Sequence, residues 1–169
     1  MKNTVRIVFA WLVMGVLTAS GEDSVACTNI LDAASKGSLA DVKGLLEKGA
    51  DVNAKGADGS TPLLHAVSGG HLDVIQFLVD QGVDVRATNA NGWTPLSRAV
   101  SSGRLDVVAF LLKKGADVDE NAERAYTPLM MAVIGNNPAM AKFLVDNGAD
   151  VNTRTGNGET PLIWAAHNN

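Results

Sequence analysis

Short runs of apolar residues with helical spacing alternate with polar turns along most of the chain. In one copy, residues 62–68 place apolar side chains on one face, follow Thr61 and end at the pair Gly69-Gly70. Thr can cap a helix through its hydroxyl, and Pro, which comes next, is tolerated at the first helical position. A second run over residues 72–79 is closed by Gly82, a residue suited to the left-handed conformation that ends many helices. The pattern therefore predicts a pair of short helices joined by a tight turn.

This helical pair recurs every 33 residues. The tripeptide Thr-Pro-Leu begins at Thr61, Thr94, Thr127 and Thr160. A second marker, Gly-Ala-Asp-Val or Gly-Val-Asp-Val, begins at residues 49, 82, 115 and 148 with the same period. Because isolated helices shorter than about 12 residues are marginal in water, each pair must bury its apolar face against a neighbour. Two markers with one period therefore predict a stack of repeats and not a single closed core.

The pattern of Gly-x-Thr-Pro-Leu, an Ala, Gly-His or its equivalent, a Leu-rich helix and Gly-Ala-Asp-Val-Asn resembles the ankyrin repeat over about residues 28–169. The resemblance implies an all-α repeat solenoid, in which helix-turn-helix units stack and β-turn loops project. It also implies a role in binding other proteins. We expect a degenerate first repeat at about 28–55, three full repeats over about 56–154 and a partial last repeat at 155–169.

The sequence departs from the family pattern at three places. The family's His after Thr-Pro-Leu, which bonds neighbouring loops, is absent, so burial must do more to hold the units together. The position of this His, directly after Thr-Pro-Leu, holds Leu64, Ser97, Met130 and Ile163. In the fourth unit, Ala125 replaces a loop glycine, and we expect a different turn shape because Ala tolerates positive φ poorly. The last unit lacks an outer helix, so residues 140–145 should be partly uncovered; either Trp164 and its neighbours form a minimal cap or the array is longer.

The first residues differ from the rest of the chain. Lys2 and Arg6 precede an uncharged apolar run over residues 7–17, and small residues follow, which is the order of a secretory signal peptide. The run of 11 residues is too short for a membrane span, which needs about 20. We therefore expect a signal peptide at residues 1–21, a short leader at residues 22–27, and a periplasmic or secreted mature protein.

Cys27 is the only cysteine, so the chain cannot form an internal disulfide. The segment Ser24-Val25-Ala26-Cys27 faintly resembles a bacterial lipobox, in which Cys27 would carry a lipid anchor. Ser24 stands where that motif prefers Leu, and the apolar run ends ten residues before Cys27. The lipid anchor is therefore the less favoured alternative.

Charge and residue spacing exclude several classes of function. Removing residues 1–21 leaves 12 basic and 18 acidic residues, and an acidic stack without a basic stripe argues against nucleic-acid binding. None of the three histidines has the spacing of a metal site, and His71 is expected to pack or hydrogen-bond within the stack. A loop that begins like a calcium site at Asp51 has Pro62 at its twelfth position, where Glu is required. We expect no cofactor, no metal and no catalysis.

Matching slots of successive units should form one continuous surface, because the units stack in register. The loop slots hold Asp58, Ser60, Asn91, Trp93, Arg124, Tyr126, Asn157 and Glu159. The inner-helix slots hold Ser68, Ser101, Ser102 and Ile134. Trp93 and Tyr126 are candidate anchors for a partner, since exposed aromatic residues are typical anchors of interfaces. Trp93 follows Asn91-Gly92, a strong hairpin signal, and could alternatively pack on its own loop.

These observations predict a monomeric adaptor of the cell envelope that binds a protein partner through its loop tips and inner helices. Two alternatives remain open. One is a secreted effector that acts on a host protein, and the other is an accessory protein that supports an oxidative-defence enzyme. Periplasmic fractionation favours the envelope adaptor, whereas recovery from the culture supernatant favours the effector.

Overall fold

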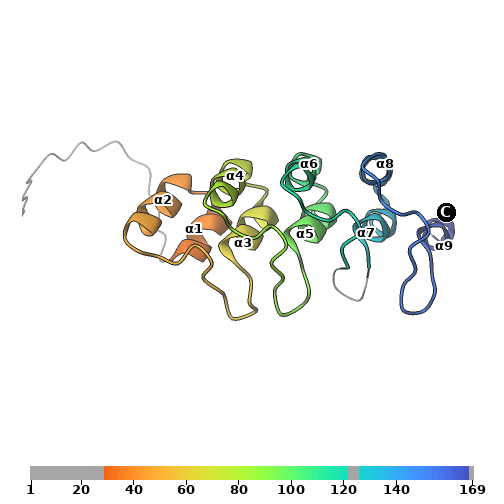
Figure 1. Cartoon of the computed structure of the whole chain (residues 1–169), viewed down its shortest axis with the longest axis horizontal. Helices are drawn as coiled ribbons and strands as arrows, with labels where there is room; N and C mark the ends of the chain where they lie inside the picture. The colour runs from red at the N-terminus through yellow and green to blue at the C-terminus, as the bar shows by residue number, and fades with distance from the viewer. Residues whose placement is uncertain (1–28, 122–125, 168–169) are drawn as a thin grey trace, which may run out of the picture.

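The structure is a computed structural model that describes residues 29–121 and 126–167, and in these residues helices form an elongated array of two layers (Figure 1). The inner layer contains α1 (Ile30–Lys36), α3 (Pro62–Gly69), α5 (Pro95–Ser101), α7 (Pro128–Ile134) and α9 (Pro161–His167). The outer layer contains α2 (Leu39–Glu47), α4 (Leu72–Asp80), α6 (Leu105–Lys113) and α8 (Pro138–Asp146). No β-strand is present in this part of the chain. The prediction of an all-α solenoid with projecting loops is confirmed (Figure 1).

Threonine caps begin the inner helices as the sequence predicts. The hydroxyls of Thr61, Thr94 and Thr127 accept hydrogen bonds from the N–H three residues later, at 3.3, 3.0 and 3.3 Å. Each Thr is followed by Pro at the first helical position. The first unit has no such Pro, and there Asn29 accepts from the N–H of Asp32 at 2.9 Å. Its inner helix therefore begins one residue later than the repeat register.

The inner helices end in a left-handed residue. Gly37, Gly70 and Gly103 have φ angles of 73°, 71° and 68°. The same slot in the fourth unit is Asn136, which is the one non-glycine residue with positive φ in the described ranges, at 49°. A left-handed residue turns the chain from the inner helix to the outer one, and Asn tolerates this conformation better than most residues.

The core lies between the two layers and continues from one unit to the next. The leucine of Thr-Pro-Leu is buried in three units, at Leu63, Leu96 and Leu129. The next slot is also buried at Leu64, Ser97 and Met130, as expected for units that lack the family's His, but Ile163 is 41% exposed. Each inner helix packs on the inner helices before and after it, and those of the first four units also pack on their own outer helices. Burial between neighbouring units therefore holds the array together.

The last unit leaves part of α8 uncovered. Met140 and Leu144 are buried, whereas Val145 is 42% exposed. On α9, Leu162 is 77% exposed although it occupies the slot of the buried leucines. Within residues 29–121 and 126–167, no outer helix follows α9 to cover this leucine, whereas the equivalent leucines of the other units pack beside one.

Hydrogen bonds also join neighbouring units, through groups other than the family's His. The Ala90 N–H donates to the Asp58 carbonyl at 2.9 Å, and Asn89 Nδ2 donates to Ser60 Oγ at 3.0 Å. His71 Nε2 donates to the Ser35 carbonyl of the preceding unit at 2.9 Å, which gives His71 the structural role expected from its slot. The stack is therefore bonded at both its loops and its helix ends.

Glu120 forms a bridge between the third and fourth units. Its carboxylate accepts a hydrogen bond from the Thr94 hydroxyl at the start of α5. Burial raises the pKa of Glu120 above its ordinary value of 4.5, although hydrogen bonds from Thr94 and Ser97 act in the opposite direction. The folded chain therefore binds this proton more tightly than the unfolded chain does.

We expect Glu120→Gln to gain stability relative to the wild type as the pH rises from about 4 to 7. A raised folded-state pKa means that the protonated carboxyl favours the fold, and this contribution is lost as the pH rises through that pKa. Glutamine stays neutral and can still accept the Thr94 hydrogen bond. Urea unfolding of both proteins across this pH range measures the difference in free energy; a difference that is constant or shrinks with rising pH contradicts the assignment.

Some sequence predictions concern residues outside the described ranges. These are the signal peptide at 1–21, the leader at 22–27, the lipid anchor at Cys27, the contact residue Arg124 and the changed turn at Ala125. Within residues 29–121 and 126–167, no helix has the length and apolar character needed to cross a membrane.

Candidate functional site

Three projecting loops are closed by the same pair of backbone hydrogen bonds. In loop 56–60, the Gly56 N–H donates to the carbonyl of residue 60 and the Gly59 N–H donates to the carbonyl of residue 56, both at 2.9 Å. Loops 89–93 and 155–159 repeat both bonds, and the glycine at the fourth position has positive φ in each. Asn91 does not have positive φ, so the Asn91-Gly92 turn is closed but is not the two-residue type I′ turn.

The first loop uses two of its predicted contact residues internally. The Asp58 carboxylate accepts from the N–H and the hydroxyl of Ser60, at 3.0 and 2.6 Å. These hydrogen bonds hold the pKa of Asp58 below its ordinary value of 3.8. Ser60 is only 7% exposed, and its hydroxyl also receives the bond from Asn89. Asp58 is exposed on the loop, whereas Ser60 supports the loop from within and offers little surface to a partner.

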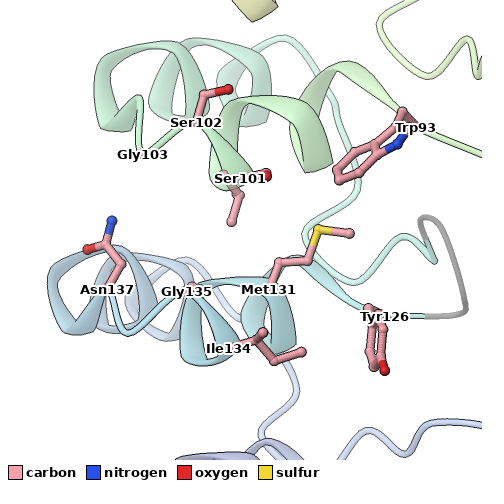
Figure 2. Close-up of a pocket in the computed structure, with 11 residues that line it drawn as sticks. Trp93, Ser101, Ser102, Gly103, Tyr126, Met131, Ile134, Gly135 and Asn137 are labelled. Atoms are coloured by element: carbon pink, nitrogen blue, oxygen red, sulfur yellow. The ribbon is translucent and has the colours of Figure 1, made fainter. Parts of the chain in front are cut away.

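A groove of about 580 Å³ lies between α5 and α7, beside the loops that precede them (Figure 2). It brings together five of the predicted contact residues, namely Trp93, Ser101, Ser102, Tyr126 and Ile134. Its other lining residues were not predicted from the sequence; they are Val100, Gly103, Met131, Ala132, Gly135 and Asn137. Asn91 and Asn157 are exposed at loop tips, Glu159 is half-buried, and Ser68 is exposed at the end of α3. The remaining described contact residues therefore lie outside this groove.

Each aromatic ring of the groove is held by a different neighbour. The Arg98 guanidinium lies over the Trp93 ring, 4.1 Å from its centroid. Tyr126 makes an edge-to-face contact with Trp164, with ring centroids 6.0 Å apart and an interplanar angle of 86°. The predicted pair of anchors thus shares one groove, but its two rings have separate supports. Trp93 packs on α5 through Arg98, not on its own loop alone.

One slot of the inner helices carries side chains that were not predicted as contact residues. It holds His65, Arg98, Met131 and Trp164 in successive units. Core slots such as the leucine of Thr-Pro-Leu keep one residue type, because every unit makes the same packing demand. A slot that admits a charged side chain such as Arg98 in otherwise similar units indicates a position that solvent can reach. This signal was available in the sequence and would have identified Met131.

The groove lining is suited to binding, because it offers both apolar surface and hydrogen-bonding groups. It combines aromatic and aliphatic side chains with two serine hydroxyls and one amide. In the described part of the chain, no cluster of three His, Cys, Asp or Glu residues could hold a metal ion. The pKa shifts of Asp58 and Glu120 arise from the hydrogen bonding and burial described above, and both residues lie outside the groove lining.

Comparison with protein families agrees with this geometry. A family model described as ankyrin repeats (3 copies) matches residues 30–122, and one described as ankyrin repeats (many copies) matches residues 111–165. The first match alone spans more than half of the 169 residues. This chain belongs to the ankyrin-repeat family. Proteins of this kind are generally non-catalytic modules for protein–protein interaction. A search of curated proteins finds no match.

Proposed function

We propose that this chain is a monomeric adaptor, exported to the cell envelope, that binds a segment of a partner protein in the groove between α5 and α7. The single observation that carries the binding site is the aromatic and aliphatic lining of this groove, in which Ile134 is exposed and Trp93, Tyr126 and Met131 are half-buried. Apolar patches on soluble proteins that are rimmed by polar residues commonly mark interaction sites. Trp93, Met131 and Ile134 supply such a surface, with serine hydroxyls at its edge.

The second unit does not repeat this apolar lining. The slots of Trp93, Met131 and Ile134 hold Ser60, His65 and Ser68 in the second unit. The repeat fold itself therefore does not require large apolar residues at these slots. The supports from Arg98 and Trp164 also order the two aromatic rings before a partner arrives, which lowers the entropy cost of binding.

We expect Trp93→Ala, Tyr126→Ala and Met131→Ala each to weaken partner binding by more than about 1 kcal/mol, which is about fivefold. Each substitution removes a side chain that a bound segment would bury. The partner is first captured from envelope extract with the full chain as bait, and its dissociation constant is then measured for each variant by calorimetry.

His65→Ala is the matched control, because His65 occupies the same repeat position as Met131, two units earlier in the chain. This control should change the affinity by less than about twofold. Circular dichroism verifies that every variant is folded. Unchanged affinity in the folded Trp93 and Met131 variants would place the interaction elsewhere on the stack.

The export part of the proposal is supported by the residue order of segment 1–21. Fractionation of the native cells, with mass spectrometry of the N-terminus, tests it. We expect the mature chain in the periplasmic fraction without Met1. A cytosolic chain that keeps Met1 would refute export, and accumulation in the culture supernatant would favour a secreted effector instead.

A further inference from the structure

The side chains of one slot cover the end of the preceding inner helix. His71 Nε2 donates to the Ser35 carbonyl at 2.9 Å, and one unit later an Arg104 guanidinium nitrogen donates to the Gly69 carbonyl at 3.3 Å. Both side chains also lie on a left-handed glycine. A Cβ atom on Gly70 would be 2.4 Å from Arg104 Cζ, and one on Gly37 would be 2.4 Å from His71 Nδ1. At these two junctions between units, a side chain with a nitrogen donor covers the C-terminal end of the preceding inner helix.

The third junction, between the third and fourth units, has the same space over the helix end, but no such side chain lies in it. The slot now holds Asn137, whose Oδ1 accepts from the Met140 N–H of its own helix at 3.0 Å. A Cβ atom on Gly103 would meet only Asn137 Nδ2, at 3.7 Å. The carbonyls of Ser101 and Ser102, equivalent to those of Ser35 and Gly69, accept no hydrogen bond from any described residue.

Ser101, Ser102, Gly103 and Asn137 line the end of the groove that lies away from Trp93 (Figure 2). We name the space bounded by Ser101, Ser102, Gly103 and Asn137 the Gly103 subsite. It is continuous with the apolar groove, so one bound segment can occupy both.

The chemistry of the subsite selects its ligand. Backbone carbonyls only accept hydrogen bonds, and the last carbonyls of a helix carry partial negative charge. At the two junctions where a side chain covers the helix end, that side chain donates an N–H to a carbonyl, which is the kind of group that matches this site. A guanidinium fits best, because its planar fork can lie flat on a glycine and donate to two carbonyls. The chain's formal net charge of −4 also favours a cation.

Among the described residues, the cations of α5 and of the turn that follows it are Arg98 and Arg104, and neither occupies the subsite. The Arg98 guanidinium is over the Trp93 ring, at the other end of the groove. The Arg104 guanidinium is over Gly70, on the side of α5 that faces the second unit. Both are engaged at these positions, so the Gly103 subsite stays open to a cation from outside.

We propose that the Gly103 subsite binds a cationic side chain of the partner segment, arginine in preference to lysine, in the way that Arg104 binds over Gly70. This inference rests on the proposed function, because it names the partner's chemistry in the same groove. Helix α5 has seven residues and is about 10 Å long, a distance that about three extended residues span. The partner segment therefore carries its arginine about three positions from the apolar residue that contacts Trp93 and Met131.

A random peptide library displayed on phage tests the inference, with the full chain as the target. We expect selected peptides to combine arginine or lysine with a large apolar residue about three positions away. Asn137→Arg supplies the cation from the chain itself, as Arg104 does, and should bind these peptides about tenfold more weakly. It should fold, because α4 and α6 begin without a side-chain cap at this slot.

Asn137→Ser is the matched control. Ser38 occupies this slot in the first unit and caps α2 by accepting from the Asp41 N–H at 3.4 Å, so serine keeps a cap and leaves the subsite open. Asn137→Ser should therefore bind the selected peptides clearly more tightly than Asn137→Arg does. Selected peptides that need Trp93 but lack a cation would overturn the subsite and leave the proposed function standing. Peptides that bind independently of Trp93, or no peptides at all, would count against the proposed function.

A second measurement decides the subsite without any partner. N-acetyl-arginine methylamide is titrated into the labelled full chain, and the amide resonances of Ser102 and Gly103 are followed by NMR. We expect saturable shifts in the wild type and in Asn137→Ser, and none in Asn137→Arg. The neutral isostere N-acetyl-citrulline methylamide should give weaker shifts. No saturable shift with the arginine probe, or equal shifts with both probes, would overturn the proposal.

Discussion

Leu96→Ala is expected to lower the free energy of unfolding by about 2–5 kcal/mol. Leu96 is fully buried between α5 and its neighbours in the middle of the array. The substitution removes apolar contacts and leaves a cavity that the packed helices cannot fill completely. Because each unit is stabilised by the units beside it, a weak central unit should also divide the single unfolding transition into two. Guanidinium unfolding followed by circular dichroism measures both effects.

Leu162→Ala is the matched control for Leu96→Ala. It is the same substitution at the same repeat slot, but Leu162 is 77% exposed on α9. We expect a change within about 0.5 kcal/mol, as for most surface substitutions. Equal losses at Leu96 and Leu162 would show that stacking between units does not determine stability.

Gly59→Ala is expected to cost about 2–3 kcal/mol, from two sources. Gly59 has a φ angle of 75°, and placing an L-residue in this region costs about 1–2 kcal/mol. Its Cβ would also lie 3.1 Å from the backbone nitrogen of Ala90, whose N–H donates to the Asp58 carbonyl of the same loop. Pushing the two loops apart weakens this hydrogen bond, which contributes about 1 kcal/mol. Chemical unfolding gives the total cost.

Gly158→Ala separates the two sources. Gly158 occupies the same loop slot with a φ angle of 81°, but no described atom lies within 4 Å of the Cβ position. Only the backbone strain should remain, at about 1–2 kcal/mol. A loss at Gly158 as large as that at Gly59 would remove the contact between loops as a cause.

Local chemistry explains why the helices were predictable. Threonine at the cap, proline at the first position and glycine after the last turn act through atoms within a few residues, so they can be read from the chain directly. The 33-residue period then aligned the units and brought Trp93 and Tyr126 to equivalent loop positions. The first unit departs from this alignment by one residue, because the position of the proline holds Asn29 and Asn29 itself caps the helix.

The candidate site was only partly predictable. Slot alignment identified Trp93, Tyr126 and Ile134 as surface residues, and the structure places all three on one groove. It also selected Ser60, whose hydroxyl turns inward to Asn89 of the next loop. Repeat slots define a position on the unit, but the direction of a side chain depends on the neighbouring unit as well.

The sequence by itself determined the helices, their caps and the fact that they stack, since these follow from local bonding and from a period of 33 residues. Only the tertiary structure decided which inner-helix ends are covered by a side chain of the next unit. His71 and Arg104 reach carbonyls 36 and 35 residues earlier in the chain, whereas Asn137 turns back to its own helix. The length of a side chain and the partner it finds across a junction are properties of two packed units together, so the open end of the groove could be found only in the folded array.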